Sequence, residues 1–586
     1  MAGEKGLSGL KTAERSKPGK DSFDYRSANV EKWVQTLPVG NIGETARLVY
    51  DALYEVNRLE ITWKERHRFL ELLREPVHYV QNSLVRRFTG MPFPLPEKAR
   101  RISLLARTLY DEMALGYKAA IEEMLEGNFL TRDNKALTLL IHRAVRYLSR
   151  SLLTCYQTYT PHPENSWLEL HSLYLYAEHK NIQQTPIKDE YNQLMPDSSI
   201  ARVYKQILLL VLTSPYRLRQ GEAEAVYSAL ARWAGHGHII PYDDPSAGEA
   251  LFVVHMDSDE APDYRVFDHR NCNSELCRLV DTRQLSKVLT EELERRKRGD
   301  ISGPIGAQLM RLLIRTWGVA PRRVFSRNDR QATIEVVVGT TMLHRALARE
   351  LAIPELSGKT ANFSSKSVTD SGHSTSDDMW DIFSSSKMKA NYEHYLNLTA
   401  EEADHEIKIP EVVSETWQIR NESAGGYRLA LEPSQSAKVQ VGELIGLRHR
   451  RDGDLWETGV VRWLRQDLEG GLEIGVQALA PQVLPVMVKK VEPKGHTADY
   501  QYGLMLPKIP TLKQPATIIT PVMLFHTGDE LILHSPDNDL KITLLQQLQA
   551  TGSFAQFLFT PSRQESSAAG EEAKGRDPIS SVWEDL

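Results

Sequence analysis

Two short stretches of the sequence carry side chains that together could hold a flat, charged ligand. The first, PRRVFSRNDR, places Arg322, Arg323 and Arg327 just before the β-branched run ATIEVVVG. A guanidinium group grips phosphate oxygens through a planar fork and also stacks on a base. The second, NESAGG, places Asn421 and Ser423 two residues apart. In an extended strand, side chains at this spacing point to the same face.

The second stretch suits the edge of a heterocycle. Asn offers an amide donor and a carbonyl acceptor, and Ser offers a hydroxyl group. Gly425 and Gly426 follow, and glycines in a strand often mark a bulge or the close approach of another molecule. Together the two stretches predict a site for a ligand that has both phosphates and guanine-like edges.

These residues resemble the two motifs of the PilZ domains, which are bacterial receptors for cyclic di-GMP. That family carries R-x-x-x-R ahead of the first strand of a six-stranded antiparallel barrel, which a helix commonly follows, and (D/N)-x-S-x-x-G further on. Here RVFSR and NESAGG match, and VGELIGL, GVVRWLR and GLEIGVQAL look like later PilZ strands. The resemblance implies that the arginines contact phosphates and stack on guanine, while the Asn and Ser hydrogen-bond the ligand. The implied binding residues are Arg322, Arg323, Arg327, Asn421, Ser423 and Gly426.

One departure from the family is large, because the two motifs are usually only a few tens of residues apart. Here a polar, Ser-rich stretch from about 355 to 408 lies between Arg327 and Asn421. Its composition predicts a disordered insertion that loops out between two adjacent barrel strands. Such a loop costs little, since closure entropy grows only logarithmically with length.

The rest of the chain predicts a multidomain α+β protein. Helical spacing of apolar residues dominates up to about 234, and the run SSIARVYKQILLLVLTS predicts a central, fully buried helix. Strand patterns with two helices follow, and strands dominate after about 320. The predicted parts are a disordered N-terminus (1–27), an all-helical domain (28–234), a mixed α/β connecting region (235–318), a PilZ-like barrel (319–485), a β-rich segment (486–561) and a disordered acidic tail (562–586).

Composition narrows the class of protein. The 586 residues carry a net charge of −6, which argues against binding to a nucleic acid polymer. We find no apolar run long enough for a membrane span and no signal-peptide core, so we expect a cytoplasmic protein without membrane insertion. Three cysteines make no disulfide framework. Cys272 and Cys277 have no matching second pair, so the sequence does not favour zinc and predicts no metal site.

Other groups of residues that could form functional sites have simpler structural explanations. His236 and His238 stand near Asp243 and Asp244, which suggests a metal cluster or, more remotely, a hydrolase, but a polar turn explains them better. We find no phosphate-binding Walker loop, G-x-S-x-G or H-E-x-x-H motif, which favours a non-enzymatic protein. The acidic segments SDDMWDIFSSS and SSVWEDL read as a solvated linker and tail, or alternatively as short docking motifs anchored by tryptophan.

The sequence thus favours a receptor that binds cyclic di-GMP, needs no further cofactor, and signals to an unidentified protein partner through its helical domain. The alternative is a ligand-independent scaffold with a degenerate PilZ barrel. Nothing in the sequence indicates an oligomeric state.

Overall fold

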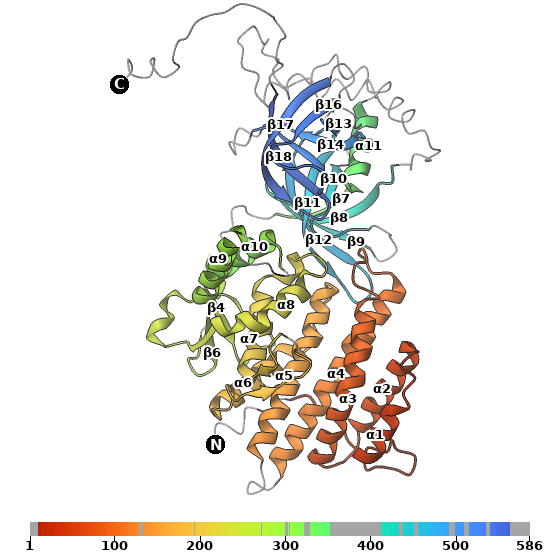
Figure 1. Ribbon diagram of the computed structural model, residues 1–586, viewed down its shortest axis with the longest axis vertical. Helices are drawn as coiled ribbons and strands as arrows, with labels where there is room; N and C mark the ends of the chain where they lie inside the picture. The colour runs from red at the N-terminus through yellow and green to blue at the C-terminus, as the bar shows by residue number, and fades with distance from the viewer. Residues whose placement is uncertain are drawn as a thin grey trace, which may run out of the picture. The chain divides into compact units, whose positions relative to one another are not determined.

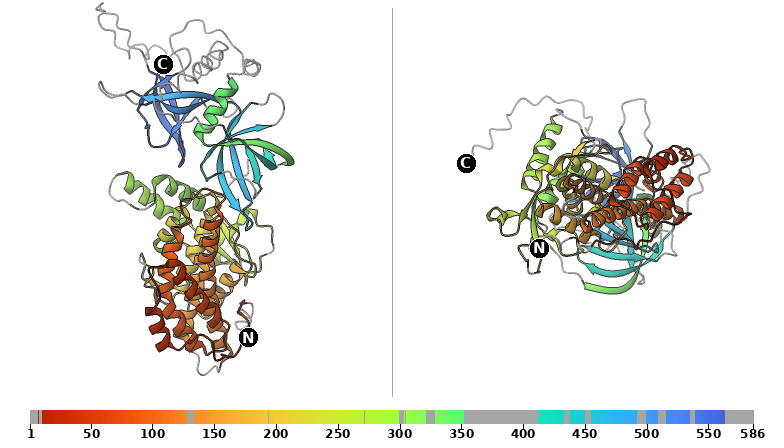
Figure 2. Two further views of the ribbon diagram at one scale, coloured as in Figure 1. Left: turned by 90° about the vertical axis from the view of Figure 1, so that its right-hand side faces the viewer. Right: turned by 90° about the horizontal axis from the view of Figure 1, so that it is seen from below.

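The computed structural model divides the chain into two compact units. The first unit comprises residues 1–339 and 413–481, and the second comprises residues 340–412 and 482–586. Figures 1 and 2 show their elements from three directions. The structure describes residues 7, 10–127, 133–192, 194–270, 272–298, 303, 305–320, 328–351, 412–432, 438–449, 455–491, 499–508, 515–534 and 539–562.

The first unit begins with long helices packed side by side, as the sequence predicts (Figure 1). Helix α3 starts at a capping box, in which the side chains of Thr62 and Glu65 each accept a hydrogen bond from the other's backbone. Helix α7 is the predicted central helix, and Ile207 to Leu210 are fully buried. Within the described ranges, none of the helices combines the length and apolar character needed to cross a bilayer. The helices are α1 (Ser27–Gln35), α2 (Ile42–Val56), α3 (Trp63–Val85), α4 (Glu97–Glu126), α5 (Asn134–Gln157), α6 (Ser166–His179), α7 (Ile200–Leu212) and α8 (Glu222–Trp233).

The segment before α1 corrects the prediction of a disordered N-terminus. Arg15 forms ion pairs with both Glu122 and Glu123 of helix α4, and the backbone of Ser16 bridges to Leu59. Disorder is therefore wrong for residues 10–26, because this polar stretch finds partners on helices that its own composition cannot reveal.

A small antiparallel sheet with strand order β3-β6-β4-β5, followed by two helices, forms the predicted mixed region. The segment GHGHIIPYDD, predicted as a turn, contains strand β3, since Ile239 and Ile240 pair with β6. The segment DYRVFDH forms only a two-residue strand, β5, before a 3₁₀ turn. The elements are β3 (His238–Pro241), β4 (Phe252–His255), β5 (Asp263–Tyr264), β6 (Cys277–Asp281), α9 (Arg283–Lys297) and α10 (Ala307–Gly318).

The first unit ends in a closed six-stranded antiparallel barrel with strand order β10-β11-β12-β9-β8-β7. Apolar side chains at alternate positions fill its interior, and Ile334, Trp417 and Ile419 are at most 1% exposed. The predicted PilZ-like barrel fold is thereby confirmed; its last strand leads straight to the next barrel instead of to a helix. The strands are β7 (Asn328–Val338), β8 (Glu415–Ser423), β9 (Gly426–Leu431), β10 (Leu444–His449), β11 (Glu457–Gln466) and β12 (Leu472–Ala480).

The insertion leaves and re-enters this barrel between neighbouring strands. Strands β7 and β8 are hydrogen-bonded partners, with Val336 opposite Glu415. The predicted placement of the insertion between adjacent strands is therefore confirmed at both of its ends. The Ser-rich stretch from 355 to 408 itself lies outside the described residues, as do the two tryptophan segments.

One helix in this part of the chain is not predicted by the sequence pattern. Helix α11 (Thr340–Leu351) follows β7 directly and belongs to the second unit. It packs on the second barrel, where the ring of His344 lies 4.7 Å from that of Tyr502. Burial lowers the pKa of His344 to about 3. The helix was missed because the neighbouring β-branched and polar runs dominate the local pattern.

The second unit is another closed six-stranded antiparallel barrel, with strand order β13-β14-β15-β18-β17-β16. When the strands of each barrel are numbered from its own first strand, the two orders are identical. The strands are β13 (Leu484–Lys490), β14 (Gln501–Leu506), β15 (Thr517–Pro521), β16 (Glu530–His534), β17 (Asp539–Ala550) and β18 (Phe554–Pro561).

Candidate functional site

The hairpin between β8 and β9 carries the second predicted motif. Ser423 and Gly426 pair at its end, so the turn between them has only two residues. The Ser423 hydroxyl accepts a hydrogen bond from the Gly425 amide and donates one to the Gly426 carbonyl, each at 3.3 Å. This hydroxyl therefore shapes the turn as well as facing outward.

Gly426 is required by the packing of strand β9 against strand β12. Its φ of +142° lies in a region that other residues rarely adopt, and an added Cβ would lie 1.9 Å from the Val476 carbonyl oxygen. Alanine here would push the two backbones apart. The glycine of the motif thus has a structural role that the sequence pattern alone does not reveal.

A bulge in β8 sets the direction of the motif side chains. The pairing register shifts between Ile419 and Asn421, which leaves Arg420 as the extra residue. Asn421 then lies opposite Arg428, two positions from the pairing of Ser423 with Gly426. The structure thus brings Asn421 and Ser423 to one face of the hairpin, as their spacing predicts.

Strand β7, which follows the arginine stretch in the sequence, begins beside the same hairpin. Arg322, Arg323 and Arg327 lie outside the described residues, but the chain on either side of them is described. Asn328, the next residue after Arg327, pairs with Glu422, which lies between Asn421 and Ser423.

An ion pair occupies the strand end beside the motifs. Arg330 of β7 donates to both carboxylate oxygens of Glu422, at 2.8 and 2.7 Å. This charge-assisted contact, made by a single guanidinium nitrogen, compensates the negative charge of Glu422 between Asn421 and Ser423. Sequence reasoning did not identify the pair, because its two members lie on either side of the long insertion.

Three further arginines gather near the hairpin from separate elements. Arg217 comes from a 3₁₀ turn after α7, Arg315 from α10 and Arg462 from β11. Burial, followed by repulsion from Arg217 and Arg315, lowers the pKa of Arg462 to about 10. Arg462 donates to Gln477 at 2.7 Å, and Gln477 lies opposite Gly426. Arg462 therefore places a positive charge beside the hairpin, and Arg217 and Arg315 lie close enough to repel it.

A tryptophan lies on the outer face of the barrel in line with Asn421. Across four neighbouring strands, Trp463, Gly475, Arg428 and Asn421 are successive pairing partners. The indole of Trp463 covers Gly475 so closely that an added Cβ would lie 1.7 Å from its Nε1 atom. This half-exposed ring is a flat surface of the kind on which a purine stacks.

The barrel and the helical region share one core. The backbone amide of Gln466 donates to the Tyr159 carbonyl at 2.8 Å. The side-chain oxygen of Gln466 accepts from the backbone amide of Leu95 at 3.0 Å. Phe93 and Val439 exchange two backbone hydrogen bonds. Buried residues of the helices and of this barrel form a single apolar cluster.

A pocket of about 710 Å³ opens between the helices and the outer face of the barrel. Its barrel side includes Arg420, Arg465 and Glu473, and its helical side includes Trp167 and Tyr216. The guanidinium carbon of Arg465 lies 4.8 Å from the centre of the Tyr216 ring. The pocket therefore brings residues of strand β8, which carries the motif hairpin, close to residues of the helical region.

The segment with His236, His238, Asp243 and Asp244 does not assemble as a site. His238 hydrogen-bonds Gln284, and Asp244 hydrogen-bonds Ser246 within its own turn. In the part of the chain that the structure describes, these side chains form no group of three metal ligands.

The barrel order, the N-x-S-x-x-G hairpin and the arginine stretch ahead of the first strand define a PilZ-type domain. Family models agree: the N-terminal domain of the cyclic-di-GMP receptor FimW matches residues 28–244, its middle PilZ domain residues 251–485, and its C-terminal β-barrel domain residues 486–562. The chain therefore belongs to the family of PilZ-domain proteins.

A curated relative is similar to the chain over almost its whole length. The chain is similar to the "Cyclic-di-GMP receptor FimW" of Pseudomonas aeruginosa, with 28% identity over 598 residues and 96% of each chain covered. No solved structure matches the chain.

Proposed function

We propose that the chain is a receptor that binds cyclic di-GMP on its first barrel and performs no chemistry on it. The observation that carries this proposal is a strand pairing: Asn328, the residue directly after the arginine stretch, pairs with Glu422, which lies between Asn421 and Ser423. The PilZ family match and the similarity to a cyclic-di-GMP receptor support it.

The ligand groups divide between the two stretches. Arg323 and Arg327, with Arg322 beside them, bind the phosphates, since guanidinium–phosphate pairs are strong and directional. Asn421 and Ser423 hydrogen-bond the ligand from the hairpin face. Gly426 keeps the hairpin close to β12, so it acts on binding through the backbone.

The outer face adds two features that suit a cyclic dinucleotide. Trp463 offers a stacking surface in the same cross-strand row as Asn421. Arg217, Arg315 and Arg462 raise the local positive potential, and Arg315 lies on the helix that leads into the arginine stretch. Both features favour a ligand with purine rings and two phosphates.

The signal passes to a protein partner through the helical region. The barrel is joined to this region by Gln466 and by the backbone exchange between Phe93 and Val439. Trp317, at the end of α10, donates to the Leu209 carbonyl of α7 at 3.2 Å. Binding of ligand to the arginine stretch would therefore act on a helix already anchored in the helical core.

The three cysteines are unpaired thiols, in keeping with a cytoplasmic site of action.

Isothermal titration of the full chain with cyclic di-GMP tests the proposal. Wild type should bind, and Arg323→Ala and Arg327→Ala should each weaken binding by roughly 10- to 100-fold, because a hydrogen bond to a charged group contributes about 1.5–3 kcal/mol. Arg295→Ala, on the exposed side of α9, removes the same charge away from the barrel and should leave the affinity unchanged.

Two results would count against a receptor. If the double variant Arg323→Ala, Arg327→Ala binds as tightly as wild type, the arginine stretch is not the phosphate site. If wild type shows no binding heat at several temperatures and no change in tryptophan fluorescence, the barrel is a ligand-independent scaffold.

A further inference from the structure

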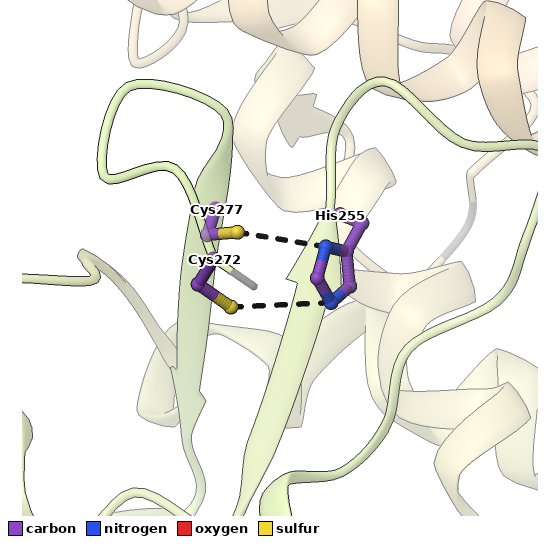
Figure 3. Close-up of side chains that lie close together, drawn as sticks. All are labelled: His255, Cys272 and Cys277. Carbon is purple, nitrogen blue, oxygen red and sulfur yellow. Dashed lines mark hydrogen bonds between the residues drawn. The ribbon is translucent and has the colours of Figure 1, made fainter. Parts of the chain in front are cut away.

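A cluster of sulfur and nitrogen ligands lies in the small sheet, away from the nucleotide motifs. His255 is the last residue of β4 and Cys277 is the first of β6, and the two are direct cross-strand partners. Cys272 stands in the turn that leads into β6. Figure 3 shows both sulfur atoms directed at the imidazole ring of His255.

The distances within this cluster are those of a metal-binding group. The Cys277 sulfur lies 3.5 Å from His255 Nδ1, and the Cys272 sulfur lies 3.9 Å from His255 Nε2. One ligand atom from each residue falls within 4.8 Å of the other two. Zinc bonds of about 2.3 Å to sulfur and about 2.0–2.1 Å to nitrogen place tetrahedral ligands roughly 3.5 Å apart. The Cys272 sulfur lies on the Nε2 side of the ring, 3.7 Å from Asp268 Oδ2, so the Cys272 side chain must turn toward Nδ1 to complete the geometry.

Asp268 supplies the partner that metal-bound histidines usually have. Its Oδ2 atom lies 3.0 Å from His255 Nε2, and its Oδ1 atom accepts from the backbone and side chain of Arg270. A carboxylate at one imidazole nitrogen fixes the ring orientation and leaves the other nitrogen for a metal. Here the other nitrogen is Nδ1, which faces Cys277.

The chemistry of the ligands selects the metal. Two thiolates and an imidazole suit zinc, whereas calcium and magnesium prefer oxygen ligands. His255 and Cys277 are buried, and Cys272 is partly exposed. A metal could therefore enter from the Cys272 side and keep one solvent ligand.

We propose that His255, Cys272 and Cys277 bind a zinc ion, with His255 coordinating through Nδ1 and Asp268 holding its ring from Nε2. The sequence pattern misses this site because the histidine is far from the cysteines along the chain and no second Cys pair accompanies them. The zinc ion ties the turn before β6 to the end of β4.

Coordination would also change the protonation of the cluster. A cysteine binds zinc as the thiolate, so each thiol must release its proton on binding, and the apparent zinc affinity should fall as the pH is lowered.

Metal analysis of the full chain, purified from zinc-supplemented cells without chelator, tests the site. We expect one zinc per chain by mass spectrometry, and after exchange for cobalt(II) an absorption band from thiolate-to-metal charge transfer. Cys272→Ser, Cys277→Ser and His255→Gln should each lose the zinc. Asp268→Asn should keep the charge-transfer band but weaken zinc binding about 10- to 100-fold.

Matched controls separate the site from general effects. His238→Gln, in the neighbouring strand β3, and Cys155→Ala, in helix α5, should both retain one zinc per chain. The proposal is overturned if wild type holds no zinc while its thiols are reduced, or if the cobalt band survives in the Cys272→Ser, Cys277→Ser double variant. A Cys272–Cys277 disulfide trapped by rapid thiol blocking in cells would overturn it too, because the pair would then be a redox site. Chelator competition on wild type decides the question even if a variant fails to fold.

Discussion

In the first barrel, strands β8 and β9 meet in a two-residue turn beside Asn421, Ser423 and Gly426. In the second barrel, the corresponding strands β14 and β15 are joined by residues 507–516, which read PKIPTLKQPA. The chain before β7 carries the arginine stretch, whereas the chain before β13 reads APQV. The two barrels thus share a strand order but differ in both places where the PilZ motifs stand.

This difference separates what the barrel needs in order to fold from what it needs in order to bind. Apolar residues at alternate strand positions fill the interior of each barrel. The arginine stretch and the N-x-S-x-x-G hairpin belong to one barrel only. A shared strand order therefore predicts a shared fold, while the proposed ligand site depends on side chains that the fold does not require.

The largest expected effect is at the glycine that holds the hairpin. Gly426→Ala should destabilise the first unit by at least about 1–3 kcal/mol, because it forces a residue with a Cβ into a rare backbone conformation and against Val476. Cyclic di-GMP affinity should fall with it. Urea unfolding followed by tryptophan fluorescence, together with titration calorimetry, measures both.

The matched control lies in the other barrel. Gly503 of β14 has no positive φ, and an added Cβ would lie 3.2 Å from its nearest atom, the Ile519 carbonyl oxygen. Gly503→Ala should therefore cost less stability and leave ligand affinity unchanged. Equal losses in the two variants would show that the glycine of the motif is not special.

A smaller effect is expected at the hairpin side chains. Asn421→Ala and Ser423→Ala should each weaken cyclic di-GMP binding by about 2- to 12-fold, since a neutral hydrogen bond contributes about 0.5–1.5 kcal/mol. Gln501→Ala, on the corresponding strand of the second barrel, is the control and should have no effect. Unchanged affinity in the Asn421→Ala, Ser423→Ala double variant would remove the hairpin face from the site.

Local patterns in the sequence predicted much of this architecture. Ile207 to Leu210 of α7 are fully buried, and Asn421 and Ser423 share a face as their spacing requires. Apolar periodicity is set by burial, so it can be read along the chain. Motif residues within one hairpin are close in sequence, so their spacing predicts which face of the hairpin they share.

Features assembled from distant segments could not be predicted in this way. The cluster of Arg217, Arg315 and Arg462 comes from three elements that only the fold brings together. The same holds for Arg330 with Glu422, which the insertion separates. Helix α11 directly follows β7 of the first barrel yet packs on the second barrel, which no local pattern indicates.

Hydrogen exchange of the full chain, with and without cyclic di-GMP, tests the contrast between the barrels most directly. Our account predicts slower amide exchange in residues 412–432 and in the stretch from 318 to 330, with weaker protection in α10, because bound ligand would order the loop that follows it. Exchange in residues 499–521 of the second barrel should not change. Equal protection in both barrels, or protection in the second alone, would contradict the assignment of the ligand to the first barrel.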